Sequence, residues 1–255
     1  MPLTLVTLPV RDDNYVYLIH DDTSGATALV DCGAVEPILG ALKDRDWTLT
    51  EIWLTHHHHD HIEGIDEIVA ATGARITGAA ADAERLPKLD REVAEGRGFD
   101  FAGHQVQVFD VPGHTVGHIA YYIPDLKAAF TADSLMALGC GRLFEGTAAQ
   151  MWDSLTKLAA LPDDTTICSG HEYTQANARF ALTIDPDNAA LQARARAVDE
   201  ARAKGEPTVP TSLAEEKATN PFLRAADPLI RRRLDLSSAS DAEVFAEIRA
   251  RKDRF

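Results

Sequence analysis

A cluster of histidines and one aspartate follows directly on the short apolar run at residues 52–55. Residues two apart in an extended segment point to the same side, so side chains at positions 56, 58 and 60 should converge. Imidazole and carboxylate ligands suit zinc, iron or manganese, and a site without cysteine is not a closed thiolate zinc site. The cluster therefore predicts metal-activated water and offers four ligands: His56, His58, Asp60 and His61.

Two other histidines of the cluster, His57 and His59, should point away from the predicted ligands, and we expect neither to bind metal. An expression tag explains the run poorly, because it is internal, follows a strand and is broken by an aspartate. A solvated polar loop is the other alternative, but so many histidines in one short segment match chance poorly.

Three later residues could complete the site, and each comes directly after a predicted strand: His114, Asp133 and His171. Each alone would more often be a turn or surface residue. Gly113 and Gly117 would free the backbone to place His114. Because the pattern recurs at the strand ends of one sheet system, we expect these residues to join the cluster.

Short strands alternate with helices over the first two thirds of the chain, which predicts a layered α/β protein. Helical spacing occurs at residues 37–46, 64–71 and 148–161, and Thr147 is the expected cap of the last. Apolar and alternating runs predict strands at residues 15–19, 28–31, 52–55, 105–111, 119–123, 128–131 and 166–168.

The composition changes at about residue 172. Residues 189–204 are rich in Ala, Arg and Glu, which are good helix formers. A last helix is expected at residues 242–251, capped by Asp241 or Ser240. The C-terminal third is therefore predicted to be helical and to complete a site built on the first part.

Composition and charge limit the kinds of binding partner expected for this 255-residue chain. Its formal net charge is −15, which disfavours nucleic acid and anionic membranes as partners. It contains no apolar run of about 18 residues, and its N-terminus lacks the features of a secretory signal. The three cysteines are far apart, so we interpret them as reduced core thiols of a cytoplasmic protein.

The seven ligand positions, matched in identity and order, resemble the metallo-β-lactamase superfamily. Within it the chain is most similar to the glyoxalase II family, the hydroxyacylglutathione hydrolases. The similarity extends along nearly the whole chain and is carried by the motifs at residues 55–58, 113–115, 140–147, 170–174 and 220–224.

The resemblance implies an αββα sandwich over residues 1–172, followed by a small helical substrate-binding domain over residues 173–255. It also implies two divalent metal ions per chain, with zinc expected and iron or manganese as alternatives. His56, His58 and His114 would bind one ion. Asp60, His61 and His171 would bind the other, and Asp133 would bridge them. Two ions, two aspartates and one hydroxide leave a net charge of +1, which suits a developing oxyanion.

The implied reaction is hydrolysis of S-(2-hydroxyacyl)glutathione thioesters by a metal-bridging hydroxide, without an acyl-enzyme. The typical substrate is S-D-lactoylglutathione, which yields D-lactate and glutathione in the second step of methylglyoxal detoxification. The resemblance places five residues against glutathione: Arg142, Phe144, Tyr173, Arg249 and Lys252. Two positions depart from some family members, which have an aromatic residue at His59 and tyrosine at Phe144, so one hydroxyl contact to substrate would be absent.

Other functions on this fold are a glutathione persulfide dioxygenase with a single iron, and a lactone or β-lactam hydrolase. The full set of seven ligands argues against the dioxygenase. The helical C-terminal third, with its basic pair Arg249 and Lys252, favours glutathione. A metal-storage domain would need a closed coordination shell. The predicted site keeps a hydroxide between its two metals, which argues for catalysis instead. RNA processing is disfavoured by the acidic charge. We expect a monomeric enzyme.

Overall fold

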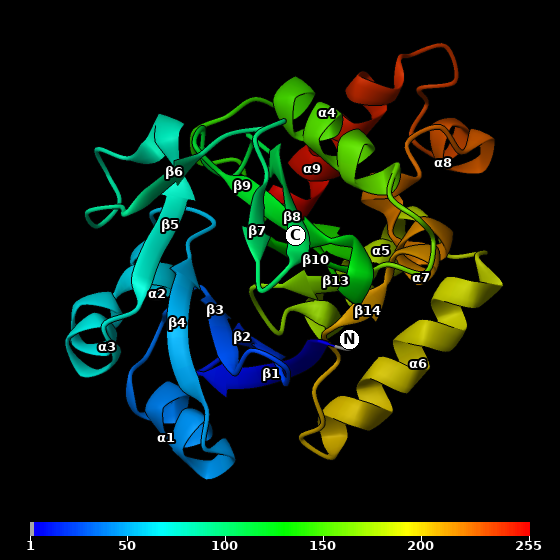
Figure 1. Cartoon of the computed structure of the whole chain (residues 1–255). Coiled ribbons are helices and arrows are strands. Elements are labelled where there is room, and N and C mark those ends of the chain that lie inside the picture. Colours follow the sequence, from blue (N-terminus) through cyan, green and yellow to red (C-terminus); the bar gives the residue numbers. More distant parts are fainter. Residues whose placement is uncertain (1–2) are drawn as a thin grey trace. The chain divides into compact units, whose positions relative to one another are not determined.

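The computed structural model describes residues 3–255 (Figure 1). These residues divide into two compact units. The first unit runs to Asp110 and includes Gly117–Thr131; the second comprises Val111–Val116 and Ala132–Phe255. The predicted domain boundary at residue 172 stays a prediction. No helix among residues 3–255 is both long enough and apolar enough to span a membrane.

The first unit contains a six-stranded sheet in the order β1-β2-β3-β4-β5-β6. Its strands β1 to β3 pair antiparallel, whereas β3 to β6 pair parallel. The parallel pairs need crossover connections. α1 (Glu36–Arg45) connects β3 to β4, α2 (His59–Ile62) and α3 (Ile65–Thr72) connect β4 to β5, and residues 80–90 connect β5 to β6. The strands are β1 (Leu3–Val10), β2 (Asn14–Asp21), β3 (Ala26–Val30), β4 (Thr48–Trp53), β5 (Arg75–Ala79) and β6 (Arg91–Val93).

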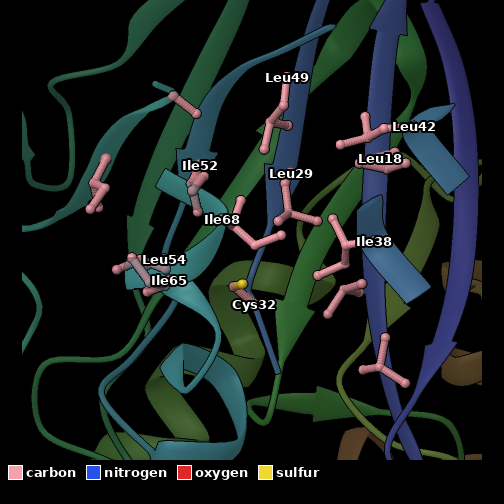
Figure 2. Close-up of a cluster of buried hydrophobic side chains, with 14 of the residues drawn as sticks. Leu18, Leu29, Cys32, Ile38, Leu42, Leu49, Ile52, Leu54, Ile65 and Ile68 are labelled. Carbon is pink, nitrogen blue, oxygen red and sulfur yellow. The ribbon is translucent and has the colours of Figure 1, made fainter. Parts of the chain in front are cut away.

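Side chains alternate across this sheet, as the two-residue period of a strand requires. Ile52 of β4 packs with Ile38 of α1 and Ile68 of α3 in one buried cluster (Figure 2). The next residue, Trp53, faces the other way and packs against the rings of Phe99 and Phe101, each with centroids 5.2 Å from its own. The sheet therefore has helices on one face and further strands on the other.

Those further strands form an antiparallel meander in the order β7-β8-β9-β10. Tyr121 of β9 donates a hydrogen bond to the carbonyl oxygen of Leu54 at 2.8 Å, which joins the meander to the end of β4. Short 3-10 helices occur at Ala80–Asp82 and Pro124–Leu126. The strands are β7 (Phe99–Phe101), β8 (His104–Asp110), β9 (Ile119–Ile123) and β10 (Ala128–Ala132).

The second unit is mainly helical, as predicted for the C-terminal third. The helices expected at 148–161, 189–204 and 242–251 are confirmed, and Thr147 and Ser240 each cap a helix through a capping box. α5 and α8 carry no helix prediction. The helices are α4 (Ala148–Ala159), α5 (Thr174–Ile184), α6 (Ala189–Ala203), α7 (Leu213–Thr219), α8 (Pro228–Arg233) and α9 (Asp241–Arg254), with a 3-10 turn at Pro221–Leu223.

Small residues let α5 and α6 pack closely, since Ala178 and Ala181 meet Leu191 and Ala195 in a cluster that also holds Leu138. Leu138 lies at the tip of a hairpin of β11 (Leu135–Met136) and β12 (Gly139–Cys140). β13 (Thr166–Ser169) pairs with β14 (Thr211–Ser212). The helical part of this unit thus packs directly on the segment that follows Asp133.

Candidate metal centre

Asp31 lies at the C-terminal end of β3, beside the end of β4 that leads into the histidine cluster. Its side chain is only 3% exposed. The carboxylate accepts hydrogen bonds from the backbone N–H of Thr55 at 2.9 Å, the Thr55 hydroxyl at 2.8 Å and Nδ1 of His61 at 2.8 Å. One buried acid therefore joins both ends of the cluster.

These contacts fix which ring nitrogens of His56 and His61 carry protons. A carboxylate only accepts, so Nδ1 of His61 and the Thr55 hydroxyl both donate to Asp31. The hydroxyl oxygen of Thr55 is then left to accept from Nδ1 of His56, 3.0 Å away. Nε2 of each neutral ring keeps its lone pair, which is the form that binds a metal.

The spacing of the donor atoms in the first unit fits shared ions. Nε2 of His56 and Nδ1 of His58 lie 3.1 Å apart, and Oδ2 of Asp60 lies 3.6 Å from Nε2 of His61. Ligands held at about 2.1 Å by one ion lie roughly 3 to 3.5 Å apart. One donor atom each from Asp31, His56 and His61 also lies within 4.8 Å of the others. Both oxygens of Asp31 already accept hydrogen bonds, so we assign it as a partner of ligands.

The predicted extended run through the cluster holds only to His58, whose backbone is extended at φ −61° and ψ 142°. The next four residues form α2, so the prediction that Asp60 converges through strand periodicity is wrong. Its carboxylate instead accepts a hydrogen bond from Asn14 at 2.8 Å. Gly33 permits this arrangement, because a Cβ there would lie 2.3 Å from the carbonyl oxygen of Asp60.

His57 and His59, the two histidines of the cluster that are not predicted ligands, contact acidic side chains. Nδ1 of His57 lies 2.9 Å from a carboxylate oxygen of the buried Asp82. The largely exposed His59 side chain lies 3.3 Å from Glu63. Their expected absence from the ligand set stays a prediction.

The second unit brings together the other three predicted ligands. Oδ2 of Asp133 lies 3.3 Å from Nε2 of His114 and 3.2 Å from Nε2 of His171. Nδ1 of His114 donates to the carbonyl oxygen of Arg142 at 2.8 Å, so its Nε2 has a lone pair in the neutral ring. A carboxylate oxygen between two imidazole nitrogens is the arrangement that a bridging ligand requires.

A close backbone approach holds this second group together. The segment that follows Cys140 passes so near Asp133 that a Cβ on Gly141 would lie 1.9 Å from the carbonyl oxygen of Asp133. Gly141 also donates to the carbonyl oxygen of Ser134 at 3.1 Å. No other residue fits at Gly141 without moving the backbone of the predicted bridging ligand.

Two of the predicted substrate residues contact predicted metal ligands. The ring of Phe144 contacts His114 edge to face at a centroid distance of 5.3 Å, and Tyr173 stacks on His171 at 4.7 Å. Phe144 is 61% exposed and Tyr173 is 40% exposed. Both rings therefore offer apolar surface beside the ligands.

The predicted basic residues differ in environment. Arg142 is exposed and lies 3.6 Å from Asp253. Arg249 is buried and donates to the carbonyl oxygen of Cys140 at 3.1 Å and to Asp253 at 2.7 Å. Lys252 lies over the Phe180 ring and donates to the carbonyl oxygen of Ala176 at 3.3 Å. Burial, followed by the charges of Arg249 and Arg179, lowers the pKa of Lys252 to about 8.

Reasoning from the sequence missed two contributors in the first unit. Asp31 carries the same signal that identified Asp133, an aspartate directly after an apolar strand. His118 stacks on His56 with centroids 4.6 Å apart, and only its place in the glycine-flanked segment after His114 hinted at a role.

The cysteines offer no nucleophile. All three are buried free thiols. Burial raises the pKa of Cys140 to about 11, and burial together with the charge of Asp31 raises that of Cys32 to about 12. Burial raises the pKa of Cys168 still further. The thiols therefore stay protonated near neutral pH.

Comparison with protein families divides the chain into two matches. Residues 10–171 match the metallo-beta-lactamase superfamily, and residues 172–255 match the hydroxyacylglutathione hydrolase C-terminus. Two curated relatives named hydroxyacylglutathione hydrolase cover the full length of both chains. One, from Roseobacter denitrificans, is 63% identical, and the other, from Ruegeria pomeroyi, is 62% identical.

Solved structures show the same fold. BLEG-1 B3 metallo-beta-lactamase is 20% identical with a TM-score of 0.67, over 86% of this chain and 99% of its own. TTHA1623, described in a di-iron-bound form, is 24% identical with a TM-score of 0.62, over 86% of this chain and all of its own. The predicted fold class, a metallo-β-lactamase sandwich followed by a helical C-terminal region, is confirmed.

Proposed function

The chain belongs to the hydroxyacylglutathione hydrolase family of the metallo-β-lactamase superfamily, and we propose that it hydrolyses S-(2-hydroxyacyl)glutathione thioesters. The typical substrate is S-D-lactoylglutathione, and the products are D-lactate and glutathione. This reaction is the second step of methylglyoxal detoxification. Identity above 60% along the full length of two relatives with that name supports the assignment.

The observation that carries the mechanism is the position of Asp133. Its Oδ2 lies within 3.3 Å of ring nitrogens from both His114 and His171, which come from separate segments of the chain. Such an oxygen can bridge two ions, one beside each histidine.

Seven residues are proposed to hold two divalent ions, expected to be zinc, with iron or manganese as alternatives. The contacts of Nδ1 in His56, His61 and His114 fit this role, because in the neutral ring each leaves Nε2 able to bind. His56, His58 and His114 would hold one ion. Asp60, His61 and His171 would hold the other, with Asp133 bridging.

Bound divalent ions supply a hydroxide nucleophile near neutral pH and polarise the thioester carbonyl. The chain's own residues orient and protect that chemistry. Asp31 and Thr55 hold the rings of His56 and His61, and the Arg142 carbonyl holds His114. The three thiols stay protonated, so the reaction needs no cysteine acyl-enzyme.

Glutathione binding is proposed for the second unit. Glutathione is anionic and this chain carries a net charge of −15, so the site needs local cations. Arg142 and Lys252 offer them. Asp253 contacts both Arg142 and Arg249, and Arg249 also donates to the carbonyl oxygen of Cys140. Tyr173 is proposed to hydrogen-bond the glutathione backbone, and Phe144 to line the pocket. In this proposal residues 173–255 form the substrate-binding domain.

The protein is further proposed to act as a monomer in the cytoplasm, where its three buried thiols would remain reduced. Light scattering during gel filtration measures the oligomeric state. A dimer under assay conditions would contradict this part alone.

The decisive experiment combines metal analysis of the purified protein with thiol release from S-D-lactoylglutathione. We expect about two ions per chain, loss of thiol release on chelation and recovery with zinc. A protein that retains two ions but releases no thiol would overturn the activity. Oxygen uptake with glutathione persulfide at one iron per chain would instead favour the dioxygenase.

A further inference from the structure

The β11–β12 hairpin carries parts of the predicted centre at both sides of its base. Asp133 precedes the hairpin by two residues, and Arg142, whose carbonyl holds His114, follows it by two. The N–H of Gly141 bonds the carbonyl oxygen of Ser134 and closes the base. The position of this short hairpin therefore sets where Asp133 presents its carboxylate.

Side chains of the helical region hold the tip of the same hairpin. Three buried side chains hydrogen-bond to backbone N–H and C=O groups of the turn. Glu216 accepts from the Leu138 N–H at 2.9 Å, Asn220 donates to the carbonyl oxygens of Met136 at 3.1 Å and Gly139 at 2.9 Å, and Asn177 donates to that of Ala137 at 3.0 Å.

The turn needs this support, because Leu138 adopts a φ of +55°. A positive φ is unfavourable for a residue with a bulky side chain, and such a residue keeps this conformation only where surrounding contacts hold it. Leu138 is fully buried in the α5–α6 cluster, which fixes its side chain, while Glu216 fixes its N–H.

Glu216 is the centre of the support. It has no exposed surface, and its two carboxylate oxygens receive four donors. One oxygen accepts from Leu138 and Asn220, and the other from Thr211 and the guanidinium of Arg194. Arg194 is itself buried and also donates to Thr219. A carboxylate is the only protein group that satisfies four donors in this way without offering one of its own.

We propose that Glu216 is a positioning residue of the metal centre, which acts by holding the tip of the hairpin whose base presents Asp133. The inference rests on the metal centre of the proposed function and adds a role for the helical region. That region would support the metal ligand as well as bind glutathione.

Glu216→Gln tests the inference, since the amide has the same shape but must turn an N–H₂ group towards one pair of donors. We expect zinc affinity, measured by competition with a chromogenic chelator, to fall about 10-fold, as for partners of metal ligands. The visible spectrum of the cobalt-loaded protein should also change, because it reports ligand geometry. Glu200→Gln is the matched control, because this glutamate lies on the exposed side of α6, and it should match the unaltered protein.

A purely structural role would lower the melting temperature of the metal-free protein while leaving zinc affinity and the cobalt spectrum of the folded protein unchanged. That result would overturn the inference. If Glu216→Gln does not fold, Asn177→Ala removes the bond to Ala137 at the same tip and should weaken zinc binding in the same direction. Unchanged affinity in that variant would equally contradict the proposal. Both measurements are independent of thioester hydrolysis, so they stand even if the proposed substrate is wrong.

Discussion

Oδ2 of Asp31 accepts a hydrogen bond from Nδ1 of His61 at 2.8 Å. The same carboxylate also accepts hydrogen bonds from the backbone N–H and the hydroxyl group of Thr55. The same acid thus sets the tautomer of His61 directly and that of His56 through the Thr55 hydroxyl. In both rings Nδ1 faces a partner within the protein, which leaves Nε2 to face the proposed metal. We therefore expect Asp31 to affect metal affinity although it is not a predicted ligand.

Replacing Asp31 by Asn should therefore weaken zinc binding by about 10- to 100-fold. The amide would turn a donor towards Thr55 or His61, which removes one of the bonds that fix the rings. Isothermal titration of the metal-free protein with zinc measures the effect. Asp44→Asn, on the exposed side of α1, is the control, and equal affinities in the two variants would contradict the role of Asp31.

Much of this arrangement was predictable from local sequence. His114, Asp133 and His171 were expected at the ends of strands predicted from apolar or alternating runs. Thr147 was the expected cap of one helix, and Ser240 was one of two candidate caps of another. These features depend on neighbours within a few residues, which a sequence displays directly.

What could not be predicted depends on contacts between distant segments. The bond between Asp31 and His61 spans 30 positions, and that between Leu138 and Glu216 spans 78. Asp60 was misplaced because strand periodicity does not reveal that a helix begins at His59. The resemblance places Arg249 against glutathione, but a resemblance does not reveal that this side chain is buried.

Asp133→Ala should prevent binding of the ion pair and lower kcat at least about 100-fold, because the variant lacks the oxygen shared by His114 and His171. Metal content after dialysis and the rate of thiol release measure the two effects. The exposed α4 variant Asp153→Asn should retain both properties. Two bound ions with near-normal turnover in Asp133→Ala would show that the ligand assignment is wrong.

Lys252 and Arg249, the basic pair on α9, should have different roles. Lys252→Ala is expected to raise KM for S-D-lactoylglutathione about 10-fold with kcat unchanged, because it removes the charge that we propose to bind a non-reacting part of the substrate. Arg249→Ala should lower kcat and the melting temperature as well, because Arg249 holds the Cys140 carbonyl that leads to Gly141 and Arg142.

Steady-state kinetics and thermal unfolding of the two single variants distinguish these roles. Arg251→Ala, on the same helix and paired with Glu247, is the control and should change neither value. Identical KM effects in Lys252→Ala and Arg249→Ala, with both proteins equally stable, would argue against a supporting role for Arg249.

Glutathione binding should also weaken as the pH rises through about 8. The pKa of Lys252 is lowered to about that value, chiefly by burial and then by Arg249 and Arg179, so its charge is present below pH 8 and lost above it. KM for the anionic thioester is therefore expected to be low at pH 7 and to rise between pH 7.5 and about 9. Lys252→Arg should remove the rise, because an arginine stays charged throughout this range. A KM profile of the unaltered protein that stays flat to pH 9, or one that the substitution leaves unchanged, would show that this charge does not bind the substrate.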